Sequence, residues 1–282
     1  RQGVPLARFY FDLYARSKKR GGAWMADCRC RRQDPAYGLT LPVAFLTCNF
    51  ASPVNDQPAL LSHDDVVTLF HEFGHGLHHM LTQVDCASVS GINGVAWDAV
   101  ELPSQFLENW CWDPDALNLI SGQVDTGEPL PLALLDKMLQ ARNFQSGMQM
   151  VRQLEFALFD FRLHNEFDGK PETLRTILEE VRAAVSVTPI SETNRFQNGF
   201  SHIFGDVMGY AAGYYSYKWA EVLSADAFSK FKEDGIFNRQ TGERFLTTVL
   251  EQGGARDALE LFIDFRGRAP SITALLQQEG IL

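Results

Sequence analysis

The spacing of apolar residues changes after the first quarter of the chain. Before that point, the run 41–50 is short, almost wholly apolar and bounded by prolines, which is typical of a buried strand. Residues 23–25 follow the turn-rich segment 18–22, and we expect them to form a second strand that pairs with the first. From Asp64 onward, the apolar residues recur at helical spacing almost throughout.

The first of these helices is expected to begin at Ser62-His63-Asp64-Asp65, which offers capping oxygens and carboxylates for a first turn. Another predicted helical stretch, 132–166, should be broken or bent near Ser146-Gly147, where glycine lowers helix propensity. Further helices are predicted over 171–186, 211–234, 240–252, 255–265 and 271–279. The pattern therefore indicates a mainly α fold with a small β-sheet near the N-terminus.

Composition narrows the classes of partner. Hydrophobic residues make up 45% of the 282 residues and charged residues 21%, which is ordinary for a globular protein with a core. The formal net charge of −10 disfavours nucleic acid and anionic membrane surfaces as partners. There is no apolar run of membrane-spanning length and no signal peptide, so we expect a cytoplasmic protein. The 5 cysteines contain no Cys-x-x-Cys pair and are expected to be reduced thiols.

The segment His71-Glu72-Phe73-Gly74-His75 points to metal chemistry. Residues four apart in a helix project from one face, so His71 and His75 can bind one zinc ion. Glu72 lies beside them, where its carboxylate can act as a general base. Gly74 inside a helix costs about 1 kcal/mol relative to alanine, which indicates that another segment approaches closely there. The alternative is a helix whose histidines bond polar groups of the core.

A catalytic zinc ion usually takes a third protein ligand, for which two candidates compete. His78 lies on nearly the same helix face as His71, but about 10 Å further along the axis. One ion would have difficulty binding both residues together with His75. Glu101, in a second predicted helix over residues 97–110, can instead complete a site of two histidines and one glutamate. We therefore expect Glu101 rather than His78 as the third ligand.

Other carboxylates on this second helix share the face of Glu101. Asp98 and Glu108 are placed to accept bonds from the ring nitrogens that the metal leaves free. Pro103 removes one backbone donor and is expected to kink the helix. The apolar neighbours favour a buried helix over a solvated acidic face; they are Trp97, Leu102, Phe106 and Trp110.

With these residues, the chain resembles the M3 family of zinc oligopeptidases, the thimet-oligopeptidase-like group. The resemblance rests on residues 70–79, 97–105 and 210–217, and on Phe265-Arg-Gly-Arg268. It implies a zincin-type (gluzincin-like) catalytic domain that spans residues 1–282. It also implies one Zn²⁺ ion and a general base, with the following residues: His71, His75 and Glu101 as ligands and Glu72 as the base.

The resemblance also assigns roles to aromatic residues. Tyr210, Tyr214 and Tyr217 are spaced to share one helix face, and such stripes are more often core than active site. The resemblance implies that Tyr214 and Tyr217 face the substrate carbonyl, where phenol donors stabilise an oxyanion. It implies that His202 is a further substrate-binding donor and that Tyr210 contacts the substrate backbone. Residues 205–209, which link His202 to Tyr210, are longer and bulkier than the family's glycine-rich link. The sequence therefore departs from the family pattern next to the two residues to which the resemblance gives these last roles.

The expected activity is that of a metalloendopeptidase, which hydrolyses internal bonds of oligopeptides. Full-length family members carry an N-terminal helical domain that forms the opposite wall of a deep channel, and we expect this domain to be absent here. Its absence would expose apolar channel surface and favour self-association. The alternative function is a non-catalytic, zinc-stabilised remnant that binds peptides or a protein partner.

Overall fold

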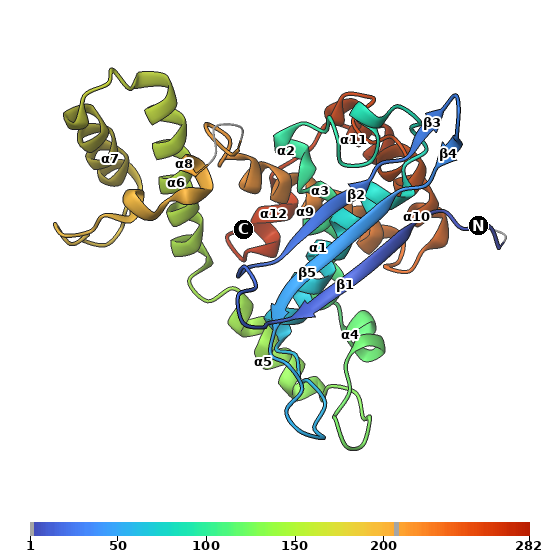
Figure 1. Ribbon diagram of the computed structural model, residues 1–282. Coiled ribbons are helices and arrows are strands. Elements are labelled where there is room, and N and C mark those ends of the chain that lie inside the picture. Colours follow the sequence, from blue (N-terminus) through green and yellow to red (C-terminus); the bar gives the residue numbers. More distant parts are fainter. Residues whose placement is uncertain (1–2, 206–208) are drawn as a thin grey trace.

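A small mixed sheet packs on a long helix near the middle of the molecule (Figure 1). The structure is a computed structural model, and it describes residues 3–205 and 209–282, apart from the side chain of His202. The helix is α1 (His63–Leu81). The sheet has the order β1-β5-β2, with β1 (Arg8–Tyr14) parallel to β5 (Val43–Phe50) and β2 (Trp24–Arg29) antiparallel to it.

Both predicted strands are present. β5 occupies most of the run 41–50, and its predicted partner is β2, in which Met25 lies opposite Leu46. The sequence pattern did not indicate β1, because this edge strand is mostly exposed and its residues Phe9-Tyr10-Phe11 do not alternate with polar ones. A two-stranded hairpin also went unpredicted; it consists of β3 (Arg32–Asp34) and β4 (Gly38–Thr40).

Helix α1 begins as its sequence predicts. The Ser62 hydroxyl accepts a hydrogen bond from the Asp65 amide, and the Asp65 carboxylate accepts one from the Ser62 amide. This capping box satisfies two amides that the helix itself leaves unpaired. On the other side from the sheet, α1 packs on α3 (Leu102–Glu108). A Cβ atom at Gly74 would lie 2.5 Å from the Pro103 carbonyl oxygen, so the close approach expected at this glycine is present.

The second predicted helix is interrupted rather than kinked. It consists of α2 (Trp97–Val100) and α3, which meet at Glu101, followed by a 3₁₀ turn at Asn109–Trp112. Pro103 lies in the first turn of α3, where a missing N–H has no intrahelical partner to lose. Proline therefore starts a new helix here, and the restart places the Glu101 side chain at the junction.

Most remaining helices match the predicted stretches, and the fold class is confirmed as mainly α. The expected break near residue 146 separates α5 from α6, whereas α9 begins later than predicted, at Ser216. The bounds are α4 (Pro114–Ile120), α5 (Leu132–Arg142), α6 (Ser146–Glu166), α7 (Pro171–Val185), α8 (Ser201–Phe204), α9 (Ser216–Asp234), α10 (Arg239–Phe245), α11 (Ala258–Arg266) and α12 (Thr273–Gln278). Short 3₁₀ turns at Ala87–Val89 and Phe196–Gly199 and a π-helical turn at Leu246–Leu250 complete the set.

Two apolar cores hold the helices. The larger lies between α3, α9, α10 and α11, and Phe106 and Phe245 stack within it with ring centroids 4.1 Å apart. The smaller joins α6 to α7 through Phe159, Leu163 and Val181, in a lobe that lies apart from the sheet (Figure 1). Burying each such side chain contributes roughly 1.5–3 kcal/mol. In the described part of the chain, every helix is too short or too polar to cross a membrane.

The segment Phe265-Arg-Gly-Arg268 near the C-terminus has a structural role, because its two arginines bond one buried carboxylate of α9. Asp226 of α9 is fully buried, and its carboxylate accepts hydrogen bonds from Arg266, from Arg268 and from the Ser271 amide. Charge-assisted bonds of this kind offset the cost of burying a carboxylate. These bonds fix α9 against the C-terminal segment, and α9 carries Tyr217 toward the site described next.

Candidate active site

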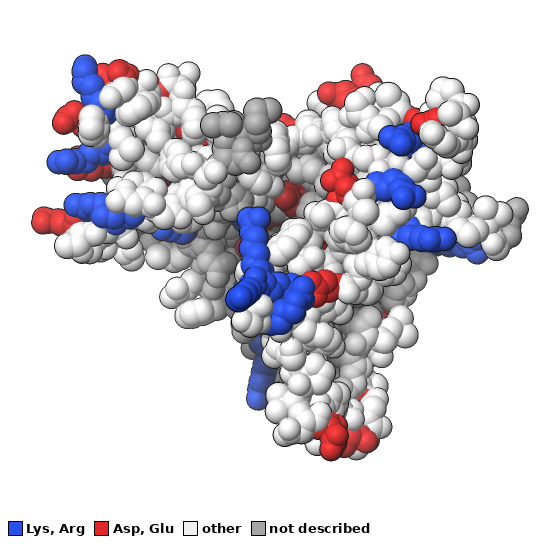
Figure 2. Space-filling view, in the orientation of Figure 1, with Lys and Arg blue, Asp and Glu red and all other residues white. Residues whose placement is uncertain are grey.

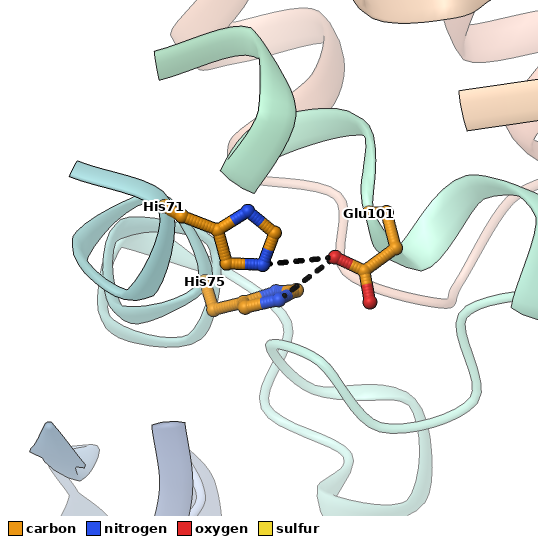
Figure 3. A group of neighbouring side chains, drawn as sticks. All are labelled: His71, His75 and Glu101. Atoms are coloured by element: carbon orange, nitrogen blue, oxygen red, sulfur yellow. Dashed lines mark ion pairs between the residues drawn. The ribbon is translucent and has the colours of Figure 1, made fainter. Parts of the chain in front are cut away.

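His71 and His75 lie one turn apart on α1, with ring centroids 4.9 Å apart. Their Nε2 atoms both face the Glu101 carboxylate, as Figure 3 shows. The distances to Glu101 Oε2 are 3.3 Å from His71 and 3.1 Å from His75. The helical spacing of four residues therefore aligns the two imidazoles, and the α2–α3 junction brings the carboxylate to them.

Glu101 is fixed from behind. Its side chain is buried, and Oε2 accepts a hydrogen bond of 2.8 Å from the Ser104 hydroxyl, which also donates to the Glu101 carbonyl oxygen. Oε1 accepts a bond of 3.3 Å from the hydroxyl of Tyr210. A buried carboxylate needs such partners, because burial removes its hydration. Glu101 is thus held in one position by contacts from the protein itself.

Electrostatics couples the three side chains. Burial would lower the pKa of His71, but its hydrogen bonds to Glu101 and Glu108 outweigh burial and raise that pKa to about 10. Burial would raise the pKa of Glu101, but the bonds from His71 and His75 hold it far below its usual range. Positive charge on His71 therefore compensates the buried carboxylate of Glu101.

The residues fit a zinc ion. One donor atom from each of His71, His75 and Glu101 lies within 4.8 Å of the others. Donors of a tetrahedral zinc site, each about 2.0–2.1 Å from the ion, lie roughly 3.3 Å from one another. The separations of 3.1 and 3.3 Å match this spacing. Two imidazoles and one carboxylate also form a donor set typical of catalytic zinc, which leaves a fourth position open.

The two carboxylates expected behind the ligands differ in position. Glu108 Oε1 lies 2.6 Å from His71 Nδ1, which fixes the ring with Nε2 toward Glu101. Asp98 instead accepts a bond of 3.4 Å from the Tyr215 hydroxyl, and no bond from Asp98 to a histidine ring is found among the described residues. His75 Nδ1 is buried and has no partner within that same part of the chain.

Glu72 lies between the cluster of His71, His75 and Glu101 and the sheet. Its side chain is 5% exposed, and burial raises the pKa of its carboxyl group. The nearby histidines and a hydrogen bond from the backbone of Met25 in β2 act in the opposite direction. Its Oε2 atom is buried and has no hydrogen-bond partner among the described residues. Glu72 therefore has one buried carboxylate oxygen that no described protein group pairs with.

The tyrosines come together, but not on one helix. Residues 210–215 form a series of turns, here called the tyrosine turn, and only Tyr217 of the three belongs to α9. The rings of Tyr210 and Tyr217 stack with centroids 5.2 Å apart, and those of Tyr214 and Tyr217 are 5.3 Å apart. Burial and the nearby Glu101 raise the pKa of Tyr210 to about 12, and burial raises the pKa of Tyr214 and of Tyr217. All three phenols are therefore neutral donors at neutral pH.

These groups line one cavity of about 1290 Å³. Its lining includes the following residues discussed above: Met25, His71, Glu72, His75, Trp97, Glu101, Tyr210, Tyr214 and Tyr217. Figure 2 shows a hollow between the α6–α7 lobe and the sheet, with acidic atoms inside it. Lys and Arg side chains gather in front of it over the segment between β1 and β2, where Arg16, Lys18 and Arg20 are exposed.

Comparison with known proteins places this chain in a family. The sequence profile described as Peptidase family M3 matches residues 2–281. The chain belongs to Peptidase family M3. It is 59% identical to oligopeptidase A from Escherichia coli (strain K12) over 276 residues, which cover 97% of this chain and 40% of that protein. It is 38% identical to dipeptidyl carboxypeptidase from Salmonella typhimurium over 281 residues, which cover 99% of this chain and 40% of that protein.

Solved structures show the same fold. PZ peptidase A with inhibitor 2 is 16% identical and has a TM-score of 0.62, with 96% of this chain and 42% of that chain covered. Pyrococcus furiosus carboxypeptidase is 16% identical and has a TM-score of 0.60, with 99% and 55% covered. The chain spans about 40% of the length of the oligopeptidase A and the dipeptidyl carboxypeptidase to which it is similar.

His78 and His79 of α1 lie away from the cluster of His71, His75 and Glu101. His78 is 3% exposed and lines a separate cavity of about 360 Å³ with Val249 and Leu261. Burial lowers the pKa of His78 to about 3, so it stays neutral. His79 Nε2 lies 2.9 Å from the Arg29 carbonyl oxygen, which ties α1 to the end of β2. The structure therefore brings Glu101, and not His78, to the histidine pair.

Some expectations concern residues that the structure leaves out. The side chain of His202, and residues 206–208 of the segment 205–209, lie outside the described residues. The segment 97–110 was expected to be mostly buried, and it is, although Trp97 itself is 48% exposed, with its ring centroid 4.5 Å from that of Tyr210.

Sequence reasoning missed several supporting residues. Ser104 bonds Glu101, Gln105 Nε2 donates to the Tyr217 carbonyl oxygen at 3.2 Å, and Gln153 Oε1 accepts from the Tyr214 hydroxyl at 2.9 Å. Ser104 and Gln105 belong to the motif 97–105, so their place next to Glu101 was a usable signal. Nothing in the local sequence relates Gln153 to Tyr214.

Proposed function

We propose that residues 1–282 form the catalytic domain of a zinc-dependent endopeptidase that hydrolyses internal bonds of oligopeptides. The observation that carries the proposal is the convergence of His71, His75 and Glu101 in one cavity with Glu72 and the tyrosines. Ligands, a base and oxyanion donors are what hydrolysis of a peptide bond requires. Membership in Peptidase family M3 supports the same reaction class.

His71, His75 and Glu101 would hold one Zn²⁺ ion. When bound, zinc supplies Lewis acidity that polarises a water molecule and the scissile carbonyl. Glu108 orients His71 through the bond at Nδ1, and Ser104 and Tyr210 orient Glu101. These bonds fix the ligand atoms in advance, which is the role that groups behind metal ligands usually have.

Glu72 is proposed as the general base. Its carboxylate accepts a proton from the attacking water and later delivers it to the leaving amine. The buried, unpaired Oε2 atom supports this role, because no protein group competes for it among the described residues. Burial raises the pKa of Glu72, and a carboxylate of raised pKa is a stronger base.

Tyr217 and Tyr214 are proposed to donate hydrogen bonds to the oxyanion, with Tyr210 and His202 contacting the substrate. The phenol groups stay protonated at neutral pH, so they donate rather than repel. The sheet edge formed by β2 lines the same cavity through Trp24 and Met25, and an extended peptide can pair with such an edge.

The test is cleavage of an internally quenched fluorescent peptide by zinc-loaded protein, with and without chelator. Glu72→Gln is expected to keep one zinc ion per chain, measured by mass spectrometry of metals, and to lose at least about 100-fold in kcat. Glu128→Gln, in an exposed loop, is the matched control and should keep full activity. Residual activity above a few per cent in Glu72→Gln would contradict the assignment of the base.

The products distinguish an endopeptidase from other peptidases. A substrate whose C-terminus is amidated should still be cleaved at an internal bond, identified by mass spectrometry of the fragments. Release of dipeptides only from free C-termini would overturn the endopeptidase proposal but keep the metallopeptidase. Zinc binding without any cleavage would instead favour a peptide-binding remnant.

A further inference from the structure

One face of α6 is turned toward the tyrosine turn. Gln153, Phe156, Asp160 and His164 follow one another at spacings of three and four residues, so they lie on one side of the helix. Gln153 bonds the Tyr214 hydroxyl, and the Phe156 ring lies 5.5 Å from the Tyr214 ring. The adjacent face of α6 packs on α7 in the smaller core. A helix fixed in its own lobe thus supports the turn.

Asp160 makes the most specific of these contacts. Its side chain is 1% exposed, and its two carboxylate oxygens accept hydrogen bonds of 2.9 Å from the amides of Ala212 and Tyr214. Ala212 has a φ of 56°, a left-handed conformation that is unfavourable for a residue with a Cβ atom. The turn therefore needs an interaction from outside itself, and the carboxylate supplies it.

The other partner of Asp160 is a histidine. His164 Nδ1 lies 2.9 Å from the Asp160 carbonyl oxygen and 2.9 Å from Asp160 Oδ1, and its ring stacks on Phe204 of α8 with centroids 6.0 Å apart. Among the described residues, Asp160 forms no ion pair with lysine or arginine. A buried carboxylate is costly without strong partners. Here those partners are two amides of one turn and a histidine that contacts the helix carrying His202.

We infer that Asp160 is a positioning residue: it holds the tyrosine turn and thereby sets the places of Tyr210 and Tyr214 in the cavity. The inference rests on the proposed function, because it assigns Asp160 to the presentation of the oxyanion donors. Asp160 acts through the backbone of the turn, whereas Tyr217 is placed by α9. Loss of the carboxylate should therefore loosen the turn, whereas His71 and His75 stay in place on α1 and Glu101 keeps its bond from Ser104.

Amide hydrogen exchange tests the holding of the turn without any reference to activity. Asp160→Asn keeps the size of the side chain but presents an N–H group to one of the two amides. Peptides covering residues 209–217 should exchange at least about tenfold faster than in the wild type. Peptides from α1 should be unchanged. Asp136→Asn, an exposed position in α5, is the matched control. Unchanged exchange over 209–217 would overturn the inference.

Kinetics tests the consequence for catalysis. Asp160→Asn should lower kcat by about 10- to 100-fold, with KM within about threefold and zinc content unchanged. In a background with both Tyr210→Phe and Tyr214→Phe, the same substitution should cost less than about threefold more, because neither phenol group is then left for Asp160 to position. A purely structural role predicts additive losses, and that result, or an unchanged kcat, would overturn the positioning role.

A second variant keeps the test available if Asp160→Asn folds poorly. His164→Phe removes the bond to Asp160 but keeps a ring against Phe204, and it should change exchange and kcat in the same direction by a smaller factor. No change in either would count against the inference. Failure of the proposed function is a different result: zinc-loaded wild-type protein would not cleave peptide, whereas the exchange experiment would still report on Asp160.

Discussion

His71 and Glu108 are joined by a bond of 2.6 Å between Nδ1 and Oε1. Because Glu108 occupies Nδ1, the other ring nitrogen is turned to Glu101 and is available to a metal. Asp98, which shares the predicted helix face, lies at Tyr215 instead. The two carboxylates should therefore differ sharply in their effect on the metal.

Glu108→Ala is expected to weaken zinc binding by about 10- to 100-fold, because the His71 ring loses the acceptor that orients it. Asp98→Ala should change the zinc dissociation constant by less than about threefold. Competition between the protein and a fluorescent zinc chelator measures both. Equal effects of the two substitutions would contradict the separate roles of these carboxylates.

Gly74→Ala should be strongly destabilising. The new Cβ atom would lie 2.5 Å from the Pro103 carbonyl oxygen and 2.6 Å from Ser104 Cα, so α1 and α3 would have to separate. We expect a loss of about 2–4 kcal/mol in the free energy of unfolding, from overpacking against backbone atoms. Urea unfolding measures this loss.

The control for Gly74 is Gly242→Ala in α10, where a Cβ atom would meet nothing within 4 Å. This change should stabilise the protein by up to about 1 kcal/mol, because alanine favours a helix more than glycine does. Equal free energies of unfolding for the Gly74→Ala and Gly242→Ala variants would contradict the close packing of α1 on α3 at Gly74.

The positions of His71, His75 and Glu101 follow from local rules. Helical spacing aligns the histidines, and a carboxylate was expected from the next helical segment. The carboxylate is presented in a different way than one kinked helix would present it, because the helix ends at Glu101 and a new helix starts at Leu102. Local signals nevertheless indicated the residue that meets the histidine pair, because both arrangements present the Glu101 side chain to α1.

The conformation of the tyrosine turn could not be predicted from the sequence. Helical spacing suggested one continuous face, but Ala212 adopts a left-handed conformation and α9 begins only at Ser216. That conformation depends on Asp160, which is remote in sequence, and no local pattern encodes such a contact. Strand β1 was missed for a related reason, because pairing with β5 and not alternation defines it.

Metal removal should reveal which residues bind zinc. A ligand that binds only the folded state stabilises it by about 4 kcal/mol at 1,000 times its dissociation constant. Zinc should therefore raise the melting temperature of the wild type, and chelator should reverse the rise. Glu101→Ala should abolish the shift, and His78→Asn should keep it. A shift lost only in His78→Asn would restore His78 as the third ligand.

The buried thiol of Cys48 should make stability fall at alkaline pH. Burial, with a smaller contribution from Glu72, raises the pKa of Cys48 from 9.0 to about 11, so the folded state favours the neutral thiol. An unfolded thiol ionises at lower pH, so this contribution is complete below about pH 9 and is lost as the pH rises toward 11. We expect the free energy of unfolding to fall by roughly 1–2 kcal/mol between pH 8.5 and 10.5 through this group alone.

Cys48→Ala isolates that contribution from the lysines and tyrosines that titrate over the same range. The substitution has a packing cost that does not depend on pH, but it should flatten the decline of the free energy of unfolding with pH. Cys28→Ala, at an exposed position in β2, should leave the decline unchanged. Urea unfolding at several pH values gives the three slopes, and parallel lines for Cys48→Ala and the wild type would show that the buried thiol does not contribute.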